Sequence, residues 1–285
     1  MTESWTVLKI LQWTADYFAD KGIAGGRLDA EVLLADVLDL DRVGLYLNFD
    51  RPLSSDELSA FRQRVTRRSR REPIQYILGE TEFWSLAFRV SPEVLIPRAD
   101  TEILVEEALQ RCPVSGPVLD VGTGSGAVVI ALAHELPERQ FEAVDISSAA
   151  LALARDNARR HGVDGRIDFR QADLYDLNGG PFGMIVANPP YIPPADMAEL
   201  MPEVRLFEPH VALCGVDADG LGAYRSLAGS RQLLGPGGWL LVEVGINQAE
   251  PVRRLFAQAG LEELFVRNDY AGVPRVVGGR EPLAA

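Results

Sequence analysis

The sequence predicts an α/β protein with a doubly wound, mostly parallel sheet of seven strands, preceded by a small N-terminal helical domain and a β-hairpin linker. Three observations predict this organisation. Residues 1–72 carry apolar residues at helical spacing. Residues 74–96 alternate apolar and polar residues around Gly79 and Ser85, which is typical of a hairpin, so the linker is placed at residues 73–98. Within residues 99–285, short strand-like runs alternate with helical patterns from Pro117 onward. We expect these three ranges to be the domains and their linker.

The N-terminal region is expected to form a bundle of four or five helices, because apolar residues recur three or four positions apart in three stretches. These stripes are Leu8, Leu11, Ala15 and Phe18; Ala30, Leu33, Leu34 and Val37; and Leu58, Phe61 and Val65. The region ends in six arginines between Arg62 and Arg71. Two interpretations of this run stay open: a solvated helix end, where cations suit the helix dipole, or a contact with an acidic partner or RNA.

Seven strands are expected after Pro117, with helices between the first five and an antiparallel hairpin at one edge for the last two. Their ranges are Val118–Val121, Phe141–Asp145, Ile167–Gln171, Met184–Ala187, Trp239–Glu243, Leu264–Arg267 and Arg275–Val277. Strands separated by helices favour a parallel sheet covered on both faces.

Composition excludes several classes of protein. The 285 residues carry a net charge of −13, which argues against stable nucleic-acid binding through general electrostatics. Two cysteines, Cys112 and Cys214, form neither a disulfide framework nor a metal motif, and the three histidines lack metal-ligand spacing, so no metal is expected. No apolar stretch reaches the length of a membrane span, and the N-terminus lacks the pattern of a secretory signal. We therefore expect a cytoplasmic protein without membrane contact.

A glycine-rich turn connects the first predicted strand to a helical run. It comprises Gly122, Thr123, Gly124, Ser125 and Gly126. Glycines at this point of a Rossmann-like fold let the backbone approach a ligand without interference from Cβ atoms. The turn also fits a dinucleotide fingerprint, so alone it does not identify the cofactor.

Three acidic residues near the carboxyl ends of successive strands favour S-adenosyl-L-methionine, with S-adenosyl-L-homocysteine as its product. Asp145 ends the second strand and is placed to bind a ribose hydroxyl pair, which NAD also has. Asp120 precedes the glycine turn, where it could order the loop or bind the cofactor ammonium. Asp173 and Leu174 follow the third strand, where they could reach the adenine amino group and pack on the ring. Taken singly, each acid could equally be a helix cap or a turn residue.

The fourth strand leads directly into Asn188, Pro189, Pro190 and Tyr191. A rigid turn explains the prolines but not the amide before them or the aromatic ring after them. An amide nitrogen becomes a nucleophile only when its lone pair points at the electrophile. Two acceptors, the Asn188 side-chain oxygen and the Pro189 carbonyl, can favour that geometry without reorganisation, and Tyr191 can cover the planar group. This pattern predicts methylation of a planar NH₂ group, without choosing among adenine N6, guanine N2 and a glutamine amide.

The chain resembles, nearly end to end, the protein-(glutamine-N5) methyltransferases of the HemK/PrmC type, which are class I methyltransferases. The similar segments, besides the glycine turn and Asn188–Tyr191, are Arg71–Tyr76, Glu82–Leu86, Val94–Arg98, Asp100–Glu102, Phe207–Pro209, Ala212–Leu213, Asp219–Leu221, Asp269–Tyr270 and Gly278–Arg280. One departure is Ala99, where the family usually has proline.

The resemblance implies a substrate-recruiting helical domain and a substrate, namely the glutamine of the Gly-Gly-Gln motif in peptide-chain release factors, which act in translation termination. It implies that the glycine turn, Asp145, Leu174 and Asn188 contact the cofactor. It also implies that Asn188 through Tyr191 hold the glutamine, and that Pro97 and Arg98 close over the site. Four alternatives stay open: methylation of a ribosomal-protein glutamine, methylation of a nucleic-acid base, a catalytically silent scaffold, and an NAD-dependent dehydrogenase.

Overall fold

The computed structural model describes residues 5–112 and 115–283. Contacts divide the chain into two compact units. The helical unit contains the residues up to Gly79 together with Met201–Phe207. The other unit contains Glu80–Leu200 and the residues from Glu208 onward, and we name it the catalytic unit because the motifs expected to bind cofactor and substrate lie in it. The chain therefore enters the helical unit twice.

Five helices form the N-terminal part of the helical unit, which confirms the small helical domain. They are α1 (Val7–Asp20), α2 (Gly26–Leu38), α3 (Arg42–Leu47), α4 (Ser55–Ser69) and α5 (Ile74–Leu78). The apolar stripes of α1, α2 and α4 face one another, so that Phe18, Leu33 and Phe61 are all buried in a common core. Ser54 and Glu57 begin α4 with a reciprocal capping box, which satisfies two backbone N–H groups at the helix start.

Most of the arginine run forms ion pairs within the helical unit. Arg64 pairs with Asp36 and Arg67 with Glu72. Arg68 lies between Asp29 and Glu203, and Arg71 also contacts Glu203. Glu203 belongs to α9 (Pro202–Phe207), the segment that returns to this unit. Four of the six arginines are thus committed to structural contacts.

A two-stranded hairpin, β1 (Glu80–Phe83) and β2 (Leu86–Arg89), follows the helical unit. Its turn is formed by Trp84 and Ser85, both with positive φ. The expectation that the hairpin pattern starts at residue 74 is wrong, because Ile74–Leu78 forms α5. Ile74, Ile77 and Leu78 lie at helical spacing against the helical core, and Gly79 ends the helix in the left-handed conformation.

The catalytic unit contains the predicted seven-stranded, mostly parallel sheet, with order β5-β4-β3-β6-β7-β9-β8. Among the described strands of this sheet, β9 alone runs opposite to the rest and pairs antiparallel with both β7 and β8, so the predicted hairpin at one edge is confirmed. The strands are β3 (Val118–Val121), β4 (Phe141–Asp145), β5 (Ile167–Gln171), β6 (Phe182–Ala187), β7 (Leu234–Glu243), β8 (Glu262–Asn268) and β9 (Pro274–Arg280).

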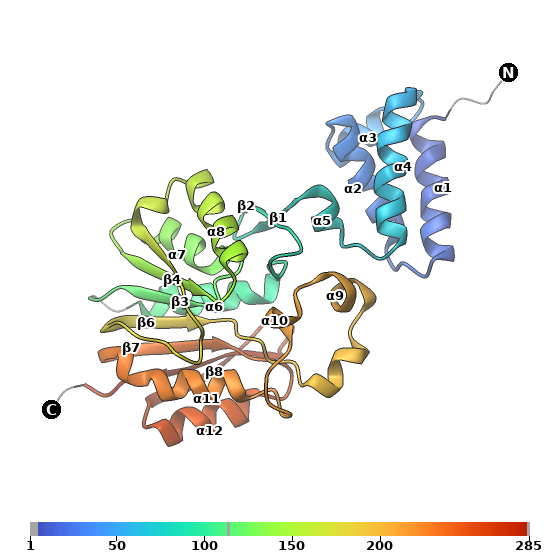
Figure 1. Cartoon of the computed structure of the whole chain (residues 1–285). Helices are drawn as coiled ribbons and strands as arrows, with labels where there is room; N and C mark the ends of the chain where they lie inside the picture. Colours follow the sequence, from blue (N-terminus) through green and yellow to red (C-terminus); the bar gives the residue numbers. More distant parts are fainter. Residues whose placement is uncertain (1–4, 113–114, 284–285) are drawn as a thin grey trace. The chain divides into compact units, whose positions relative to one another are not determined.

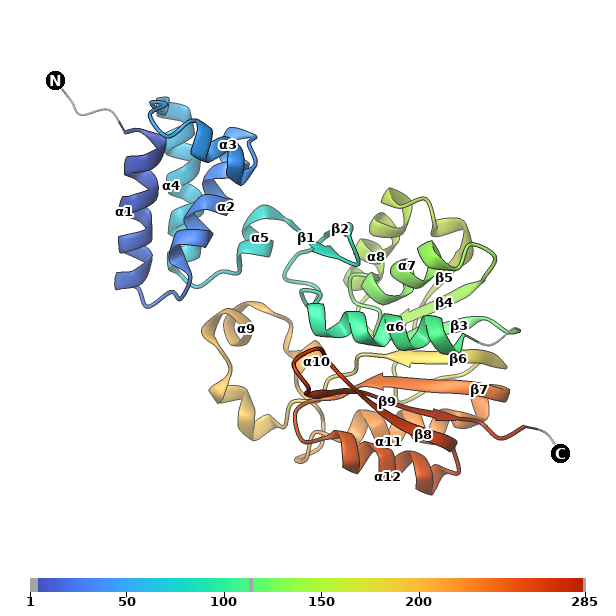
Figure 2. The same cartoon turned by 180° about the vertical axis from the view of Figure 1, so that it is seen from behind.

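Helices cover both faces of this sheet (Figure 1 and, from behind, Figure 2). One face is covered by α6 (Glu102–Arg111), α7 (Ala127–Glu135) and α8 (Ser148–Arg160), and the other by α11 (Gly222–Gly229) and α12 (Ala249–Ala259). Shorter helical segments are η1 (Ala99–Thr101), η2 (Asp164–Arg166), η3 (Pro194–Glu199), α10 (His210–Leu213) and η4 (Ser230–Leu233). The sheet is therefore covered on both sides, which explains why every residue of β3 and β6 is buried.

One connection differs from the expected alternation of strands and helices. Residues 172–181 join β5 to β6 without a helix, although a helix was expected between each pair of the first five strands. Gly179 and Gly180 both have positive φ and precede Pro181, and such residues do not continue a helix. The connection instead forms a loop with a turn at Asp173–Asp176 and contributes Ala172–Tyr175 to a cavity.

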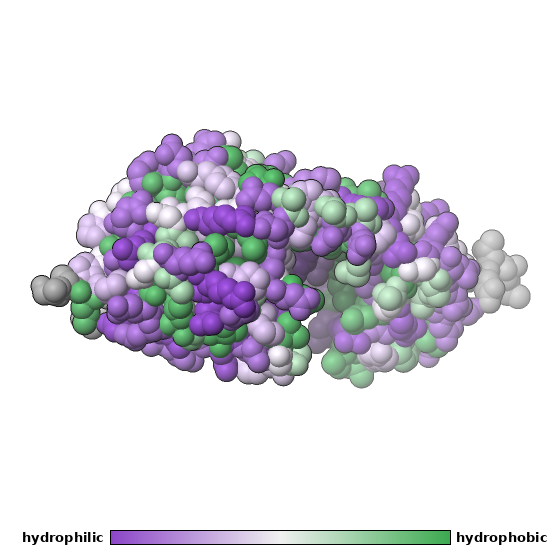
Figure 3. Space-filling model, turned by 90° about the horizontal axis from the view of Figure 1, so that it is seen from below, coloured by the Kyte–Doolittle hydropathy of each residue, from purple (hydrophilic) through white to green (hydrophobic). Residues whose placement is uncertain are grey.

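Charged residues make up 24% of the chain, and its net charge is −13. The face of the molecule in Figure 3 carries hydrophilic side chains over most of its area, with hydrophobic ones dispersed among them. None of the helices within residues 5–112 and 115–283 combines the length and the apolar composition that a bilayer crossing requires.

Candidate functional site

A cavity of about 300 Å³ opens at the carboxyl edge of the central parallel strands. Strands β3, β4 and β6 end there side by side, with Val121 opposite both Val144 and Ala187. All lining residues belong to the catalytic unit: Glu93, Val94, Leu95, Pro97, Arg98, Thr101, Asp120–Ser125, Ala127, Val128, Asp145–Ser147, Ala150, Ala172–Tyr175, Asn188, Pro190, Pro209, Val211, Ala212, Cys214 and Val216. This is the position at which doubly wound sheets bind their ligands.

The glycine turn forms one wall of the cavity. Gly122 and Gly124 have φ values of +74° and +55°, and no atom lies within 4 Å of a Cβ placed on Gly122. A side chain there would project into open space that a ligand could fill. Gly126 differs, because its Cβ would meet Ile130 Cδ1 at 2.8 Å and Ala154 Cβ at 3.2 Å. Gly126 does not line the cavity and instead allows α7 and α8 to pack closely.

Asp120 stabilises the conformation of this turn. Its carboxyl is buried and accepts a hydrogen bond from the Thr123 hydroxyl at 2.7 Å. Burial raises the pKa of Asp120 to about 7, although the Thr123 hydroxyl opposes that shift. Of the two roles considered for Asp120, the structure therefore supports ordering of the loop.

Asp145 joins the glycine turn to the start of α8. Its Oδ2 atom accepts from the Gly124 N–H and its Oδ1 atom from the Ser147 N–H, both at 2.9 Å. Burial raises the pKa of Asp145, and these backbone hydrogen bonds counteract the shift. The carboxylate is thus held rigidly at the cavity edge, as a group that binds a ribose diol must be.

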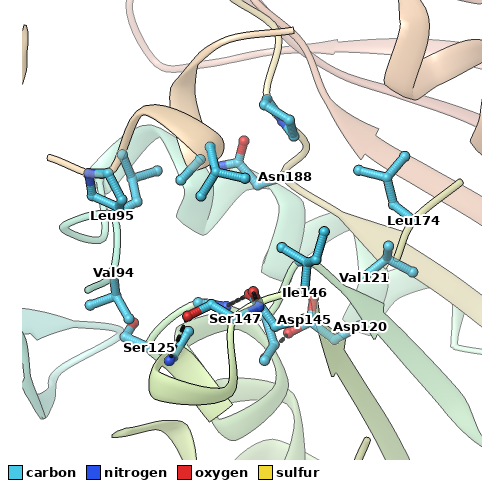
Figure 4. A pocket seen from close by; sticks show the side chains of 18 of the residues that line it. Val94, Leu95, Asp120, Val121, Ser125, Asp145, Ile146, Ser147, Leu174 and Asn188 are labelled. Carbon is cyan, nitrogen blue, oxygen red and sulfur yellow. Dashed lines mark hydrogen bonds between the residues drawn. The ribbon is translucent and has the colours of Figure 1, made fainter. Parts of the chain in front are cut away.

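The loop that follows β5 lines another part of the cavity, through Ala172–Tyr175. Asp173 accepts a hydrogen bond from the Tyr175 N–H at 3.0 Å, so it forms the local turn as well as lining the cavity. Figure 4 shows Leu174 and Val121 on one side of the cavity and Val94 and Leu95 on the other, which makes a slot with apolar walls. Such a slot suits a flat ring.

Asn188 is positioned where β6 ends. Its Nδ2 atom donates to the Thr101 hydroxyl oxygen at 3.2 Å, and its carboxamide lines the same cavity as Asp145 (Figure 4). Pro190 also lines the cavity.

Pro189 and Tyr191 are not among the described lining residues. The Tyr191 ring packs against Gly245, and its carbonyl accepts from Gln248 Nε2 at 2.9 Å. Burial raises the pKa of Tyr191 to about 12, and the nearby Glu243 adds to this. Tyr191 therefore supports the wall, and its contact with a planar substrate group stays a prediction.

Pro97 and Arg98 line the cavity, and the buried carboxylate of Glu208 holds their segment in place. Glu208 accepts from the Ile96 N–H at 3.2 Å and forms an ion pair with Arg98. The segment that follows Glu208 also lines the cavity, through Pro209, Val211 and Ala212. Glu208 thus ties together two segments that border the site.

Sequence reasoning assigned no role to several residues at this site. Thr101 and Glu208 lie within the family-like segments, and Ile146 and Ser147 follow Asp145 directly. Glu243 ends β7 at the carboxyl edge of the sheet. In the sequence, an acidic residue directly after an apolar run could have indicated this position. No group of side chains in the described ranges has the composition and spacing to hold a metal ion.

Comparisons with known proteins agree with this geometry. Residues 9–79 match the PrmC N-terminal domain family, and residues 98–203 match the methyltransferase small domain family. A release factor glutamine methyltransferase from Geobacter sulfurreducens is 51% identical over 280 residues, covering 98% of both chains. One from Chlorobaculum tepidum is 43% identical, covering 95% of this chain and 96% of that protein.

Two solved structures share the fold at low sequence identity. The hMettl16 catalytic domain has a TM-score of 0.57 at 14% identity, covering 76% of this chain and 81% of that chain. A methyltransferase from Pyrococcus furiosus has a TM-score of 0.52 at 14% identity, covering 70% of this chain and 90% of that chain. The near full-length identity to the curated relatives decides the assignment: this chain belongs to the release factor glutamine methyltransferase family.

Proposed function

We propose that this enzyme methylates the side-chain amide nitrogen of the glutamine in the Gly-Gly-Gln motif of peptide-chain release factors, in the cytoplasm, with S-adenosylmethionine as methyl donor. The observation that carries the proposal is the Asn188 carboxamide, which borders the same cavity as the glycine turn and Asp145. The Asn188 side-chain oxygen, which can accept a hydrogen bond from an NH₂ group, thus lies at a cavity that can bind the nucleoside part of the cofactor. The relatives named for this activity match the chain over nearly its whole length.

The residues present fit the cofactor. The open backbone at Gly122 and Gly124 suits the part of the ligand that must approach the main chain. Asp145 would bind the ribose hydroxyls, and Asp173 and Leu174 would bind the adenine. When bound, S-adenosylmethionine supplies an electrophilic methyl group.

The protein's own contribution is positioning. We assign the Asn188 Oδ1 atom and the Pro189 carbonyl as acceptors for the two N–H bonds of the substrate amide. Those hydrogen bonds favour a nitrogen whose lone pair points out of the amide plane. Since both acceptors belong to a turn fixed by two prolines, little reorganisation accompanies the reaction. No strong base is required, because the amide nitrogen becomes acidic on methylation and its proton can pass to solvent.

The substrate class is tested by transfer of label from tritiated S-adenosylmethionine. Purified release factor, release factor with its motif glutamine changed to alanine, large-subunit ribosomal protein, rRNA and DNA are compared as acceptors. We expect label only in the intact release factor, and a gain of one methyl group in the Gly-Gly-Gln peptide by mass spectrometry. Label in nucleic acid or ribosomal protein, with none in release factor, would refute the proposal.

A further inference from the structure

Three side chains from separate elements meet beside the cavity. Asn188 follows β6, Thr101 ends η1 and Glu243 ends β7. Asn188 Nδ2 donates to Thr101 Oγ1 at 3.2 Å, and both Thr101 and Asn188 form hydrogen bonds to the Glu243 carboxyl that oppose the rise of its pKa. Thr101 is 5% exposed and Glu243 is 2% exposed, so water competes little for these contacts.

Glu243 is costly to bury at this position. Its Oε2 atom has no hydrogen-bond partner within the described ranges, and burial raises the pKa of the carboxyl to about 7. A buried carboxyl that lacks full pairing lowers stability. An apolar residue would continue the run of Leu240, Leu241 and Val242, so packing alone does not explain a glutamate here.

The contacts determine which way the Asn188 carboxamide points. A carboxamide has two N–H donors on one side and an acceptor oxygen on the other. Thr101 Oγ1 and an ionised Glu243 both accept, so they favour the orientation in which Nδ2 faces them. The reverse orientation would bring Oδ1 against a carboxylate. Oδ1 is then directed away from this pair and stays available to another donor.

We propose that Thr101 and Glu243 are positioning residues that fix the Asn188 carboxamide with its oxygen presented to the substrate amide. The inference rests on the proposed function, because only an NH₂ substrate needs that oxygen. A flipped carboxamide would present a second donor to the substrate, and the acceptor for its N–H bond would be lost.

The ionisation state of Glu243 follows from its surroundings. The titratable groups that face it are Asp100 of η1, Tyr191 after β6, Tyr224 of α11 and Arg275 of β9. Arg275 favours the carboxylate and Asp100 opposes it. A protonated Glu243 would become a donor and would no longer select the Nδ2 side of Asn188. Turnover should therefore fall as the pH drops through the pKa of this carboxyl.

The test uses the full chain with Thr101→Val, Thr101→Ser and Glu243→Gln. Thr101→Val keeps the shape but removes the hydroxyl, whereas Thr101→Ser keeps the hydroxyl. We expect Thr101→Val and Glu243→Gln to lower kcat for release-factor methylation by roughly 10–100-fold, somewhat less than removal of a preorganised contact itself. Thr101→Ser should stay within about threefold of the wild type, and the Kd for S-adenosylmethionine should change little in all three.

Two readouts separate positioning from a structural role. The wild-type kcat should rise with pH and level off above about 7, and Glu243→Gln should remove that inflection. By NMR, the Asn188 side-chain NH₂ protons should exchange slowly with solvent in the wild type and in Thr101→Ser, and rapidly in Thr101→Val. This second measurement needs no turnover and also serves if Glu243→Gln folds poorly.

Either of two results would overturn the inference: equal NH₂ exchange in the wild type and Thr101→Val, or equal kcat values in Thr101→Val and Thr101→Ser. If the wild type methylates release factor and the variants match it, the positioning role fails while the proposed function stands. If the wild type leaves release factor unmodified but protects its Asn188 NH₂ protons, the contacts stand and the proposed substrate fails.

Discussion

Replacing Gly220 with alanine should displace the backbone of the proposed catalytic turn. Gly220 has φ +68° and lies directly against Tyr191, because a Cβ placed on Gly220 would be 2.4 Å from the Tyr191 carbonyl oxygen and 3.1 Å from Gln248 Nε2. Real Cβ contacts stay at 3.0 Å or more. Residue 220 and the Tyr191 carbonyl must therefore separate by at least 3.0 − 2.4 = 0.6 Å, and the part of this shift that Tyr191 takes up disturbs its hydrogen bond from Gln248 Nε2.

Gly220→Ala should lower both the stability of the fold and the turnover. A left-handed alanine costs about 1–2 kcal/mol of stability. A misplacement near 1 Å in a catalytic group can lower turnover by about 10²-fold, so we expect kcat for release-factor methylation to fall by about 10–100-fold. The proposed cofactor contacts at Gly122, Gly124 and Asp145 lie elsewhere, so the Kd for S-adenosylmethionine should stay within about twofold of the wild type.

Gly162 offers a matched control within the catalytic unit. It has the same φ of +68°, but nothing lies within 4 Å of its Cβ position. Gly162→Ala should therefore lower the thermal stability by the conformational cost alone and leave kcat unchanged. The assay is transfer of tritium from the cofactor to release factor at saturating concentrations of both. Equal turnover in Gly220→Ala and Gly162→Ala would refute the idea that Gly220 positions the turn.

Four further outcomes are expected. Asn188→Ala should keep the fold and lower turnover by about 10²–10³; near-normal turnover in the tritium assay would contradict its role. Asp145→Ala should raise the Kd for S-adenosylmethionine by about 10–100-fold, the scale of a hydrogen bond to a charged group, and an unchanged calorimetric titration would count against ribose binding. Glu208→Ala should raise the KM for release factor by about tenfold, because the segment carrying Arg98 loses its buried anchor; an unchanged KM in steady-state kinetics would disprove this. Asp120 has a pKa of about 7 in the folded state, above the usual 3.8. Protonation of its carboxyl therefore stabilises the folded state fully below about pH 4, and this stabilisation is lost as the pH rises to about 7. The melting temperature of the wild type minus that of Asp120→Asn should therefore fall across this window, and a constant difference would argue against a raised pKa.

Local patterns predicted most of the fold. Strands β3, β4 and β5 begin and end where the sequence predicts. The edge strand β5 does so although it is partly exposed and alternates apolar with polar residues. The short helix α5 was assigned to the hairpin, since five residues are too few to separate a helical from an alternating period. The missing helix between β5 and β6 shows that a ten-residue loop with Gly-Gly-Pro can join two parallel strands.

The site residues also fall into two groups, those that local sequence patterns predicted and those that they did not. The glycine turn and Asn188 were visible in the sequence because each depends on neighbours within a few positions. The contact between Arg98 and Glu208 spans 110 residues, and Thr101 lies 87 residues from Asn188. Such pairs are brought together only by the order of strands in the sheet, so one sequence read along its length does not reveal them.

The return of α9 to the helical unit limits how this protein can be divided. A chain shortened to begin at Glu80 would keep Pro202–Phe207 but lose Arg68 and Arg71, which neutralise Glu203. Swapping only the N-terminal helices between relatives would create the same mismatch. Chimeric enzymes built to alter substrate choice should therefore exchange α9 together with α1–α5, as one recombination block taken from two stretches of the gene.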